Sequence, residues 1–192
     1  HSLYDLVRGT TKQLESDNGA AETTEAESLT TFGTDGFTVG SLAQVNTNTE
    51  DYVSWNWLGS NSTSTTSPAG STASTSTVAS AGHFSVVSYT GTGSNATVGH
   101  GLGGKPDLII IKRRSTATNW PIISTPTTAT KVFYLDLTND ASTSGAGQWQ
   151  DTEPTASVFS LGTAGDANGS SLTFIAYCFR SVPGVCQVGS YT

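Results

Sequence analysis

The sequence has 192 residues, of which 12% are charged, and a formal net charge of −7 at pH 7. A nucleic-acid-binding protein needs a basic face, so this acidic balance argues against that class. No apolar run approaches the roughly 20 residues of a membrane span, so we expect no membrane insertion. Short runs of Thr, Val, Tyr and Phe lie between clusters of Gly, Asn, Asp and Ser. This pattern predicts short strands joined by turns, and therefore an all-β chain.

Composition and self-similarity divide the chain into four parts. In chain order, we predict a partial β-module at residues 1–59, a Ser/Thr-rich linker or surface strand at 60–82, a complete module at 83–182, and the start of a further strand or a tail at 183–192. The first residue is His1 rather than methionine. We interpret the chain as a processed product or as a piece of a longer one.

The prediction of two modules depends on an internal repeat. Residues 36–60 match residues 158–182 without a gap. The matched pairs are Phe37 with Phe159, Gly40 with Gly162, Asn46 with Asn168, Tyr52 with Phe174, Trp55 with Tyr177, and Trp57 with Phe179. So many matches in one fixed frame predict a duplicated module.

Each matched segment ends in a stretch with the period-two pattern of a β-strand. In such strands Trp55 and Trp57 share one face, and Tyr177 and Phe179 share the equivalent face. We predict that these four rings point into the core of an antiparallel β-sandwich of the jelly-roll type, built from two related sheets. The alternative is that Trp55 and Trp57 form an exposed platform on which a sugar stacks.

A glycine-rich stretch follows in the second module. Gly99, Gly104 and Lys105 have the spacing of a phosphate-binding P-loop. The position that should carry Ser or Thr is Pro106, which has neither a hydroxyl nor an N–H. The β-branched run that follows predicts a strand rather than a helix, so we interpret the glycines as sources of positive φ before a buried strand that begins near Pro106. His100 is expected to have a turn or hydrogen-bonding role.

The acidic residues do not form a convincing catalytic pattern. Paired carboxylates could act on a glycosidic bond, and four acidic residues surround a Thr/Ser-rich segment: Asp136, Asp140, Asp151 and Glu153. The sequence has 15 acidic residues, enough to produce such groupings readily, so we interpret them as solvated loops. The stretch 165–171 offers oxygen ligands for Ca²⁺, but Gln44 replaces Asp166 in the matching segment. We expect no enzyme activity, no metal and no cofactor.

Two tryptophans and two cysteines complete the candidate site residues. Trp120 and Trp149 are our candidates for glycan binding, because an exposed ring in polar surroundings can stack on a sugar. A buried ring would instead close one end of a sandwich, and burial is favoured for Trp149. Cys178 and Cys186 lie on either side of a turn, so they are candidates for a disulfide. The alternative is that Cys178 is a small buried apolar residue.

Several motifs occur in a fixed order along the chain. They are L-Y-D-L-V-R-G-T-T-K (Leu3 to Lys12), A-E-T-T-E-A (Ala21 to Ala26), D-G-F-T-V-G (Asp35 to Gly40), Y-V-S-W-N-W (Tyr52 to Trp57), Y-T-G-T-G (Tyr89 to Gly93), T-V-G-H-G-L-G-G-K-P-D-L-I-I-I-K (Thr97 to Lys112), P-T-A-S-V-F-S-L-G (Pro154 to Gly162) and V-G-S-Y-T (Val188 to Thr192). Together they resemble a module that recurs in tail-fibre and other virion proteins of bacteriophages, especially marine and cyanobacterial phages. The resemblance implies an all-β domain on a virus particle and brings no established catalytic residues with it.

We therefore predict a non-enzymatic structural or attachment protein of a bacteriophage particle, such as a tail-fibre, decoration or filament-forming subunit, located in the virion or outside the cell. Its partners would be further copies of itself, joined by strand addition in a homo-oligomer or filament, and other virion proteins. The alternative is a carbohydrate-binding module or adhesin that recognises a cell-surface glycan. An enzyme acting on polysaccharide is the third hypothesis.

Overall fold

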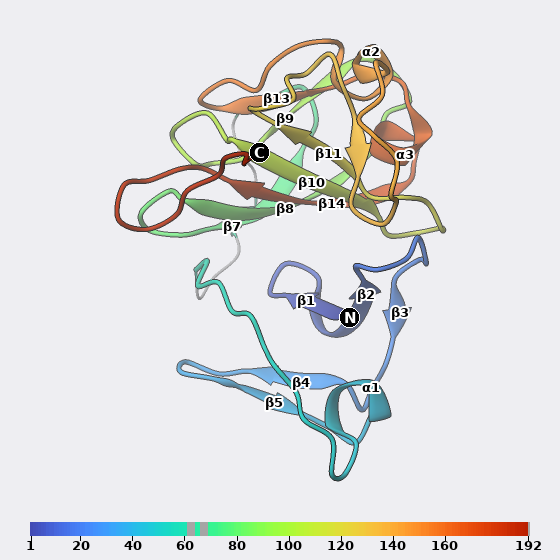
Figure 1. The fold of residues 1–192 in the computed structure, drawn as a ribbon, viewed down its shortest axis with the longest axis vertical. Coiled ribbons are helices and arrows are strands. Elements are labelled where there is room, and N and C mark those ends of the chain that lie inside the picture. The colour runs from blue at the N-terminus through green and yellow to red at the C-terminus, as the bar shows by residue number, and fades with distance from the viewer. Residues whose placement is uncertain (61–63, 66–68, 192) are drawn as a thin grey trace.

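The computed structural model describes residues 1–60, 64–65 and 69–191 (Figure 1). The fold is an all-β sandwich in which the strands of every sheet pair antiparallel, and helices make up only 7% of the chain. The strands are short because apolar and β-branched runs are interrupted every few residues by Gly, Asn, Asp and Ser. The all-β class predicted from the sequence is confirmed.

The largest sheet has seven strands and forms the centre of the molecule (Figure 1). Its strands, in spatial order, are β12 (Phe133–Tyr134), β11 (Pro121–Ser124), β10 (Leu108–Arg113), β14 (Thr173–Phe179), β8 (Phe84–Thr90), β7 (Ser74–Val78) and β6 (Ser64–Thr65). In the middle, β14 pairs antiparallel with both β10 and β8, and Tyr177 lies opposite Ile110 on one side and Val86 on the other. Because both edges of β14 are paired, its backbone groups are satisfied within the sheet.

Smaller elements cover the two faces of the central sheet. One face is covered by a two-stranded sheet and two helical turns: β9 (Ala96–Gly99), β13 (Val158–Leu161), α2 (Gly145–Trp149) and α3 (Gly165–Asn168). The other face is covered by the N-terminal strands β1 (Ser2–Asp5), β2 (Gly9–Glu15) and β3 (Thr23–Thr24). Farther from the central sheet in Figure 1 lie β4 (Leu29–Phe32), β5 (Phe37–Val39) and α1 (Ala43–Asn46).

The side chains of β14 alternate between two hydrophobic cores, as the period of a strand requires. Phe174 and Cys178 lie in the core beneath β9, β13, α2 and α3. Ile175 and Tyr177 lie in the core beneath the N-terminal strands, and Phe179 packs against its edge. The predicted core face of Tyr177 and Phe179 is therefore confirmed. The opposite face is buried as well, because the central sheet is covered on both sides.

The segments that flank the second module differ in structure. Residues 60–82, expected to be a linker or a surface strand, supply β6 and β7 to one edge of the central sheet. Residues 183–191 contain no strand, and an antiparallel bridge between Val182 and Cys186 closes a turn there. Whether these residues are a tail or the start of a further strand stays a prediction.

The glycine-rich stretch between β9 and β10 forms a tight loop. Gly101 and Gly103 adopt φ values of +74° and +67°, in the left-handed region that glycine enters without a steric penalty. The residues after Pro106 form strand β10 and not a helix. The P-loop is therefore excluded, and the prediction of glycine-dependent turns before a buried strand is confirmed.

Buried charges join the N-terminal strands to the central sheet. The side chain of Arg8 is fully buried and forms ion pairs with Asp5 and Glu22. Tyr177 of β14 donates its hydroxyl to Asp5 over 2.8 Å, and Arg114 donates two hydrogen bonds to Glu22 over 2.8 and 2.9 Å. Because each buried charge has an opposite charge and hydrogen-bond partners, the cost of its desolvation is offset.

One local motif occurs in both matched segments. In each, a strand (β5 or β13) leads through a glycine into a four-residue helix (α1 or α3). The side-chain amide of Asn46 donates to the carbonyl of Gly40 over 2.8 Å, and that of Asn168 donates to the carbonyl of Gly162 over 2.7 Å. An added Cβ would collide with the backbone of Glu27 at Gly40, and with the backbone of Gly147 in α2 at Gly162. Beyond the helices the match ends, because residues 51–57 form no strand. Duplication of the whole module stays a prediction.

Candidate functional site

An exposed apolar segment, residues 52–58, follows α1 and leads to the central sheet; we call it the aromatic segment. Its five large apolar side chains are all at least half exposed: Tyr52 (51%), Val53 (78%), Trp55 (77%), Trp57 (52%) and Leu58 (74%). The prediction that Trp55 and Trp57 point into a core is therefore wrong. The segment belongs to no sheet, so no facing layer can bury its rings.

The aromatic segment is anchored at both ends. At its start, the hydroxyl of Tyr52 donates to the carbonyl of Ala43 in α1 over 2.8 Å. At its end, the ring of Trp57 lies with its centroid 6.0 Å from that of Phe179 and 6.4 Å from that of Phe84. These contacts explain why Tyr52 and Trp57 are less exposed than the residues between them.

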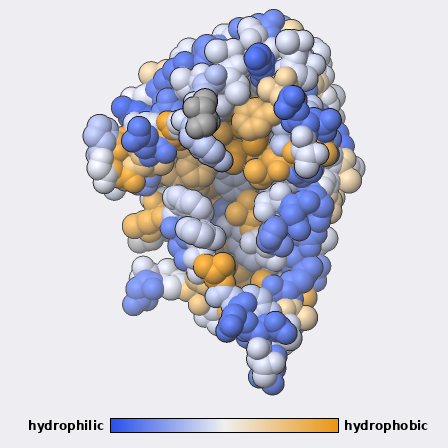
Figure 2. Space-filling model, viewed as in Figure 1, coloured by the Kyte–Doolittle hydropathy of each residue, from blue (hydrophilic) through white to orange (hydrophobic). Residues whose placement is uncertain are grey.

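The backbone between the anchors is unpaired. Within the described residues, the backbone of residues 51–59 forms no hydrogen bond with other backbone groups. Its N–H and C=O groups therefore face solvent next to large apolar side chains. Figure 2 shows that hydrophobic side chains on this face gather mainly across its middle, between two ends that are mostly hydrophilic. The exposed side chains of the aromatic segment follow one another along the chain, and exposed apolar patches mark interaction sites in soluble proteins.

A polar pocket of about 240 Å³ lies beside β2 and α1. It is lined by Gln13, Glu15, Ala20, Ala21, Thr23, Glu25 and Gln44. The amide of the buried Gln13 donates to Gln44 over 2.8 Å, and the amide of Gln44 donates to Glu15 over 3.0 Å. The hydroxyl of Tyr4 donates to Gln13 over 2.9 Å. This chain of hydrogen bonds fixes the orientation of both amides, and each amide keeps a second N–H.

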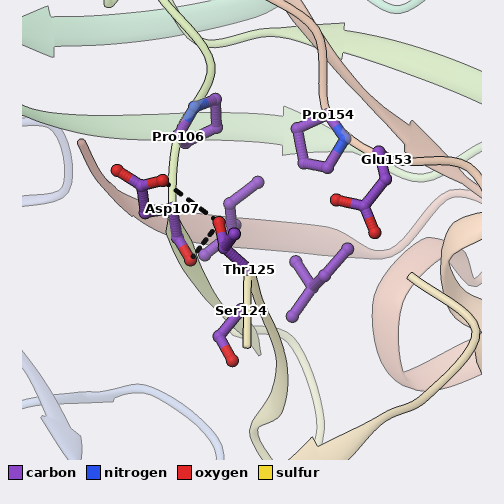
Figure 3. A pocket seen from close by; sticks show the side chains of 8 residues that line it. Pro106, Asp107, Ser124, Thr125, Glu153 and Pro154 are labelled. Atoms are coloured by element: carbon purple, nitrogen blue, oxygen red, sulfur yellow. Dashed lines mark hydrogen bonds between the residues drawn. The ribbon is translucent and has the colours of Figure 1, made fainter. Parts of the chain in front are cut away.

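A second, narrower pocket, without room for a water molecule, lies where β10 begins and β11 ends (Figure 3). Burial disfavours the charged form of its Asp107, but hydrogen bonds from Ser181 and Thr125 outweigh that effect and lower the pKa of Asp107. Burial likewise opposes the charge on Glu153, but Lys105, 2.8 Å away, and a backbone N–H lower the pKa of Glu153. A general acid needs a raised pKa, so neither carboxylate is suited to that role.

The other predicted carboxylates have separate surroundings. Asp136 accepts a hydrogen bond from the backbone N–H of Trp120 over 3.0 Å. Asp140 and Asp151 are exposed, as expected for solvated loops. Asp166, in the stretch considered for Ca²⁺, accepts the hydroxyl of Tyr134 over 2.9 Å. No group of three or more potential metal ligands comes together within the described residues.

Both tryptophans proposed for glycan binding are buried. Trp120 is fully buried, donates its indole N–H to the carbonyl of Asn18 over 2.8 Å, and lies with its ring centroid 5.4 Å from the ammonium of Lys112. Trp149 is 1% exposed and lies in the core beneath β9 and β13. Neither ring offers a face to a sugar, so the glycan-stacking prediction for these residues is corrected. The burial favoured for Trp149 is observed.

The two cysteines are free, so the predicted disulfide is absent. Cys178 is fully buried in the core, and burial raises the pKa of its thiol to about 12. Cys186 is only partly buried, in the turn that follows β14. Cys178 therefore fits the alternative reading of a small apolar core residue, because its side chain points into the sheet sandwich and away from that turn.

His100 has the hydrogen-bonding role predicted for it. The side chain is fully buried, its Nδ1 accepts the backbone N–H of Leu102 over 3.2 Å, and its Nε2 lies 3.3 Å from the carbonyl of Thr155. Burial lowers the pKa of His100, so the neutral ring is favoured. A neutral ring with both nitrogens engaged stabilises the loop before β10.

The sequence identified the aromatic segment but assigned it the wrong surroundings, and it gave no sign of the polar pocket. The pocket residues come from separate stretches between Gln13 and Gln44 that share no motif. Their proximity depends on how the N-terminal strands fold onto α1. No helix in the described part of the chain is long and apolar enough to cross a membrane.

The geometry defines a class: an all-β sandwich with an exposed, unpaired aromatic segment and two pockets whose polar groups are held by structural hydrogen bonds. The chain belongs to a family described as a domain of unknown function, DUF7483, whose model matches residues 1–192. No curated protein matches the chain. No solved structure matches it either.

Proposed function

We propose that this chain is a non-enzymatic structural or attachment protein of a bacteriophage particle, which assembles with further copies of itself and with other virion proteins. The observation that carries the proposal is the aromatic segment. Trp55 is 77% exposed in a segment whose backbone is unpaired, a combination that a partner surface would cover. We propose a bacteriophage particle because the ordered motifs resemble modules of phage virion proteins.

The surroundings of the titratable groups support a structural role. Asp5 and Glu22 are neutralised by Arg8 and Arg114 between the N-terminal strands and the central sheet. Asp107 and Glu153 have lowered pKa values and are held by structural hydrogen bonds. General acid–base catalysis instead relies on groups whose pKa values are shifted toward the working pH.

Sedimentation velocity over a wide concentration range tests the proposal. We expect the chain to self-associate and Trp55→Ser to remain monomeric, because the substitution removes the largest exposed ring of the segment. Tyr191→Ser is the matched control, since Tyr191 is an exposed aromatic outside the segment. A chain that stays monomeric at every concentration, or associates equally well without Trp55, would contradict the proposal.

The polar pocket favours carbohydrate binding as a second candidate function. Its amides can donate and its carboxylates can accept, which suits the hydroxyl groups of a neutral sugar. A cation would use only the acceptors, and an anion would be repelled by Glu15 and Glu25. Because the pocket is not aromatic, this function does not depend on Trp120 or Trp149.

Nuclear magnetic resonance titration with neutral methyl glycosides tests this second function, with glucuronate as an anionic control. We expect the side-chain amide signals of Gln13 and Gln44 to shift with the neutral ligands. Gln44→Ala should weaken binding roughly fivefold, because a hydrogen bond contributes about 1 kcal/mol. Gln187→Ala is the matched control at an exposed glutamine. Unchanged amide signals across the panel would exclude the pocket as a sugar site.

A further inference from the structure

The aromatic segment has the sequence of a central strand but no sheet. In the frame that superimposes the two strand–glycine–helix motifs, Trp55 corresponds to Tyr177, and residues 51–57 correspond to β14. β14 is paired on both edges, with β8 and β10. Residues 51–57, in contrast, pair with no strand within the described residues.

An unpaired strand sequence of this kind is a template for pairing with another chain. The backbone N–H and C=O groups of residues 51–59 are free of other backbone groups within the described residues. Exposed strand edges add strands readily unless they are blocked by charge, proline or a bulge. No proline or charged residue occurs between Tyr52 and Gly59.

We propose that residues 51–59 of two copies of this chain pair as antiparallel β-strands, about a two-fold axis through Trp55. The inference rests on the self-assembly proposed above and names the partner surface. A two-fold interface is self-complementary, because each copy presents the same segment to the other.

The sequence of the segment fits this register. A two-fold axis at Trp55 places Trp55 opposite its own copy and Val53 opposite Trp57. The period of a strand puts these three residues on one face of the pair. Directly opposite side chains on one face of an antiparallel pair are in contact, and aromatic pairs stabilise such sheets. Val53, Trp55 and Trp57 of the two copies would therefore cover each other.

Charge favours the antiparallel direction. Glu50 and Asp51 precede the segment, and no charged residue follows within the next 50 positions up to Gly101. In the antiparallel pair Asp51 lies opposite Gly59 of the second copy. A parallel pair in register would instead place Glu50 and Asp51 beside their own copies, and like charges placed opposite each other destabilise a sheet.

The contacts of Trp57 place the segment beside an apolar cluster of the central sheet. The ring of Trp57 already packs against Phe84 and Phe179, at the ends of β8 and β14. Pairing would extend this apolar cluster to the second copy. Trp57 is still 52% exposed, so part of its ring remains available to Val53 of the partner strand.

Disulfide trapping tests the register. In the proposed pair Ser54 lies opposite Asn56 of the second copy, with the Cα separation of about 4.5–5.5 Å that a disulfide spans. Two variants are prepared in a Cys186→Ser background: Ser54→Cys and Asn56→Cys. We expect the mixture to form cross-linked dimers in several-fold excess over either variant alone. Ser94→Cys mixed with Asn56→Cys is the control, because Ser94 is exposed on a distant loop.

The outcomes separate this inference from the proposed function. Efficient cross-linking of Ser54→Cys with itself would overturn the inference, because that residue meets its own copy only in another register or a parallel pair. Trp55-dependent association without cross-links in the mixture would also overturn it, while the self-assembly function would stand. If sedimentation shows only monomers at all concentrations, both the strand pairing and the proposed self-assembly are wrong.

Discussion

Residues 37–46 and 159–168 have nearly the same local structure, yet the residues that follow them do not. Each begins with a strand, a glycine and a helical turn, closed by an asparagine side chain on the glycine carbonyl. After the second motif the chain enters β14, in the middle of a seven-stranded sheet. After the first it forms the exposed aromatic segment, with no sheet around it.

The difference shows that the strand–glycine–helix motif is encoded locally, whereas the strand that follows it is not. The motif needs only a close-packed glycine and one side-chain hydrogen bond, which the sequence itself supplies. A strand needs neighbouring strands, because its stability comes from cross-strand pairs and burial rather than from backbone preference alone. The sequence of residues 51–57 is therefore compatible with a strand, but its state depends on which chains are present.

The largest expected effect comes from removing equivalent aromatic rings in the two segments. Phe174 is fully buried in β14 and stacks on Tyr89, with ring centroids 5.2 Å apart. Phe174→Ala should lower the free energy of unfolding by about 3–5 kcal/mol, because it leaves a cavity in the core. Its counterpart Tyr52 is half exposed, and Tyr52→Ala should cost less than about 1 kcal/mol.

Urea denaturation of the two variants measures this difference. It should be carried out at a protein concentration where the chain is monomeric, because association would stabilise the exposed segment by mass action. Equal losses for Phe174→Ala and Tyr52→Ala would mean that the aromatic segment is buried in the monomer in solution.

The second comparison concerns the two layers that cover the central sheet. The layer of β9 and β13 packs through apolar side chains, whereas the N-terminal layer also depends on the ion pairs of Arg8. Arg8→Met should lower the free energy of unfolding by about 3 kcal/mol, because the buried carboxylate of Asp5 loses its charged partner. The loss should change little with salt, since buried pairs are weakly screened. A loss below about 0.5 kcal/mol would show that the N-terminal layer is not docked through these charges.

The features predicted correctly from the sequence are those with local causes. The strand after Pro106 and the turns at Gly101 and Gly103 depend on neighbouring residues, so their pattern was sufficient. The link between Asp5 and Tyr177 could not be predicted, because these residues are 172 positions apart and show no charge pattern. The exposure of Trp55 was only the alternative to a core position for a related reason, since the sequence cannot show whether a strand has partners.

The third comparison uses the paired asparagines. Asn168 is fully buried, and its amide also donates to the carbonyl of Ser94 over 2.7 Å, while its oxygen accepts the backbone N–H of Thr92 over 2.8 Å. Asn168→Ala should lower the free energy of unfolding by about 2–3 kcal/mol, because buried backbone groups lose their partners. Asn46 is exposed, so Asn46→Ala should cost about 0.5 kcal/mol. Chemical denaturation of both variants measures the two losses of unfolding free energy. A larger loss for Asn46→Ala than for Asn168→Ala would show that the first motif is the more constrained one.

The smallest expected effect is a pH dependence at the contact between the two parts of the chain. Lys112 of β10 is fully buried and donates to the carbonyl of Gly19 in the N-terminal part over 2.9 Å. Burial lowers the pKa of Lys112 to about 8, with Arg113 adding to this shift and Asp136 opposing it. Above pH 8 the folded chain has released this proton while the unfolded chain keeps it, so the unfolded state binds more protons and stability rises with pH.

The measurement for Lys112 is the difference in unfolding free energy between the native chain and Lys112→Met. This difference should shift in favour of the native chain by about 1 kcal/mol between pH 8 and 9, the slope expected for one proton. The variant removes the titrating group but leaves the tyrosines and cysteines that also titrate at high pH, so their contributions cancel. A difference that is flat over this range, or that falls, would mean that the two carbonyls and the Trp120 ring hold the ammonium charged at the boundary between the two parts.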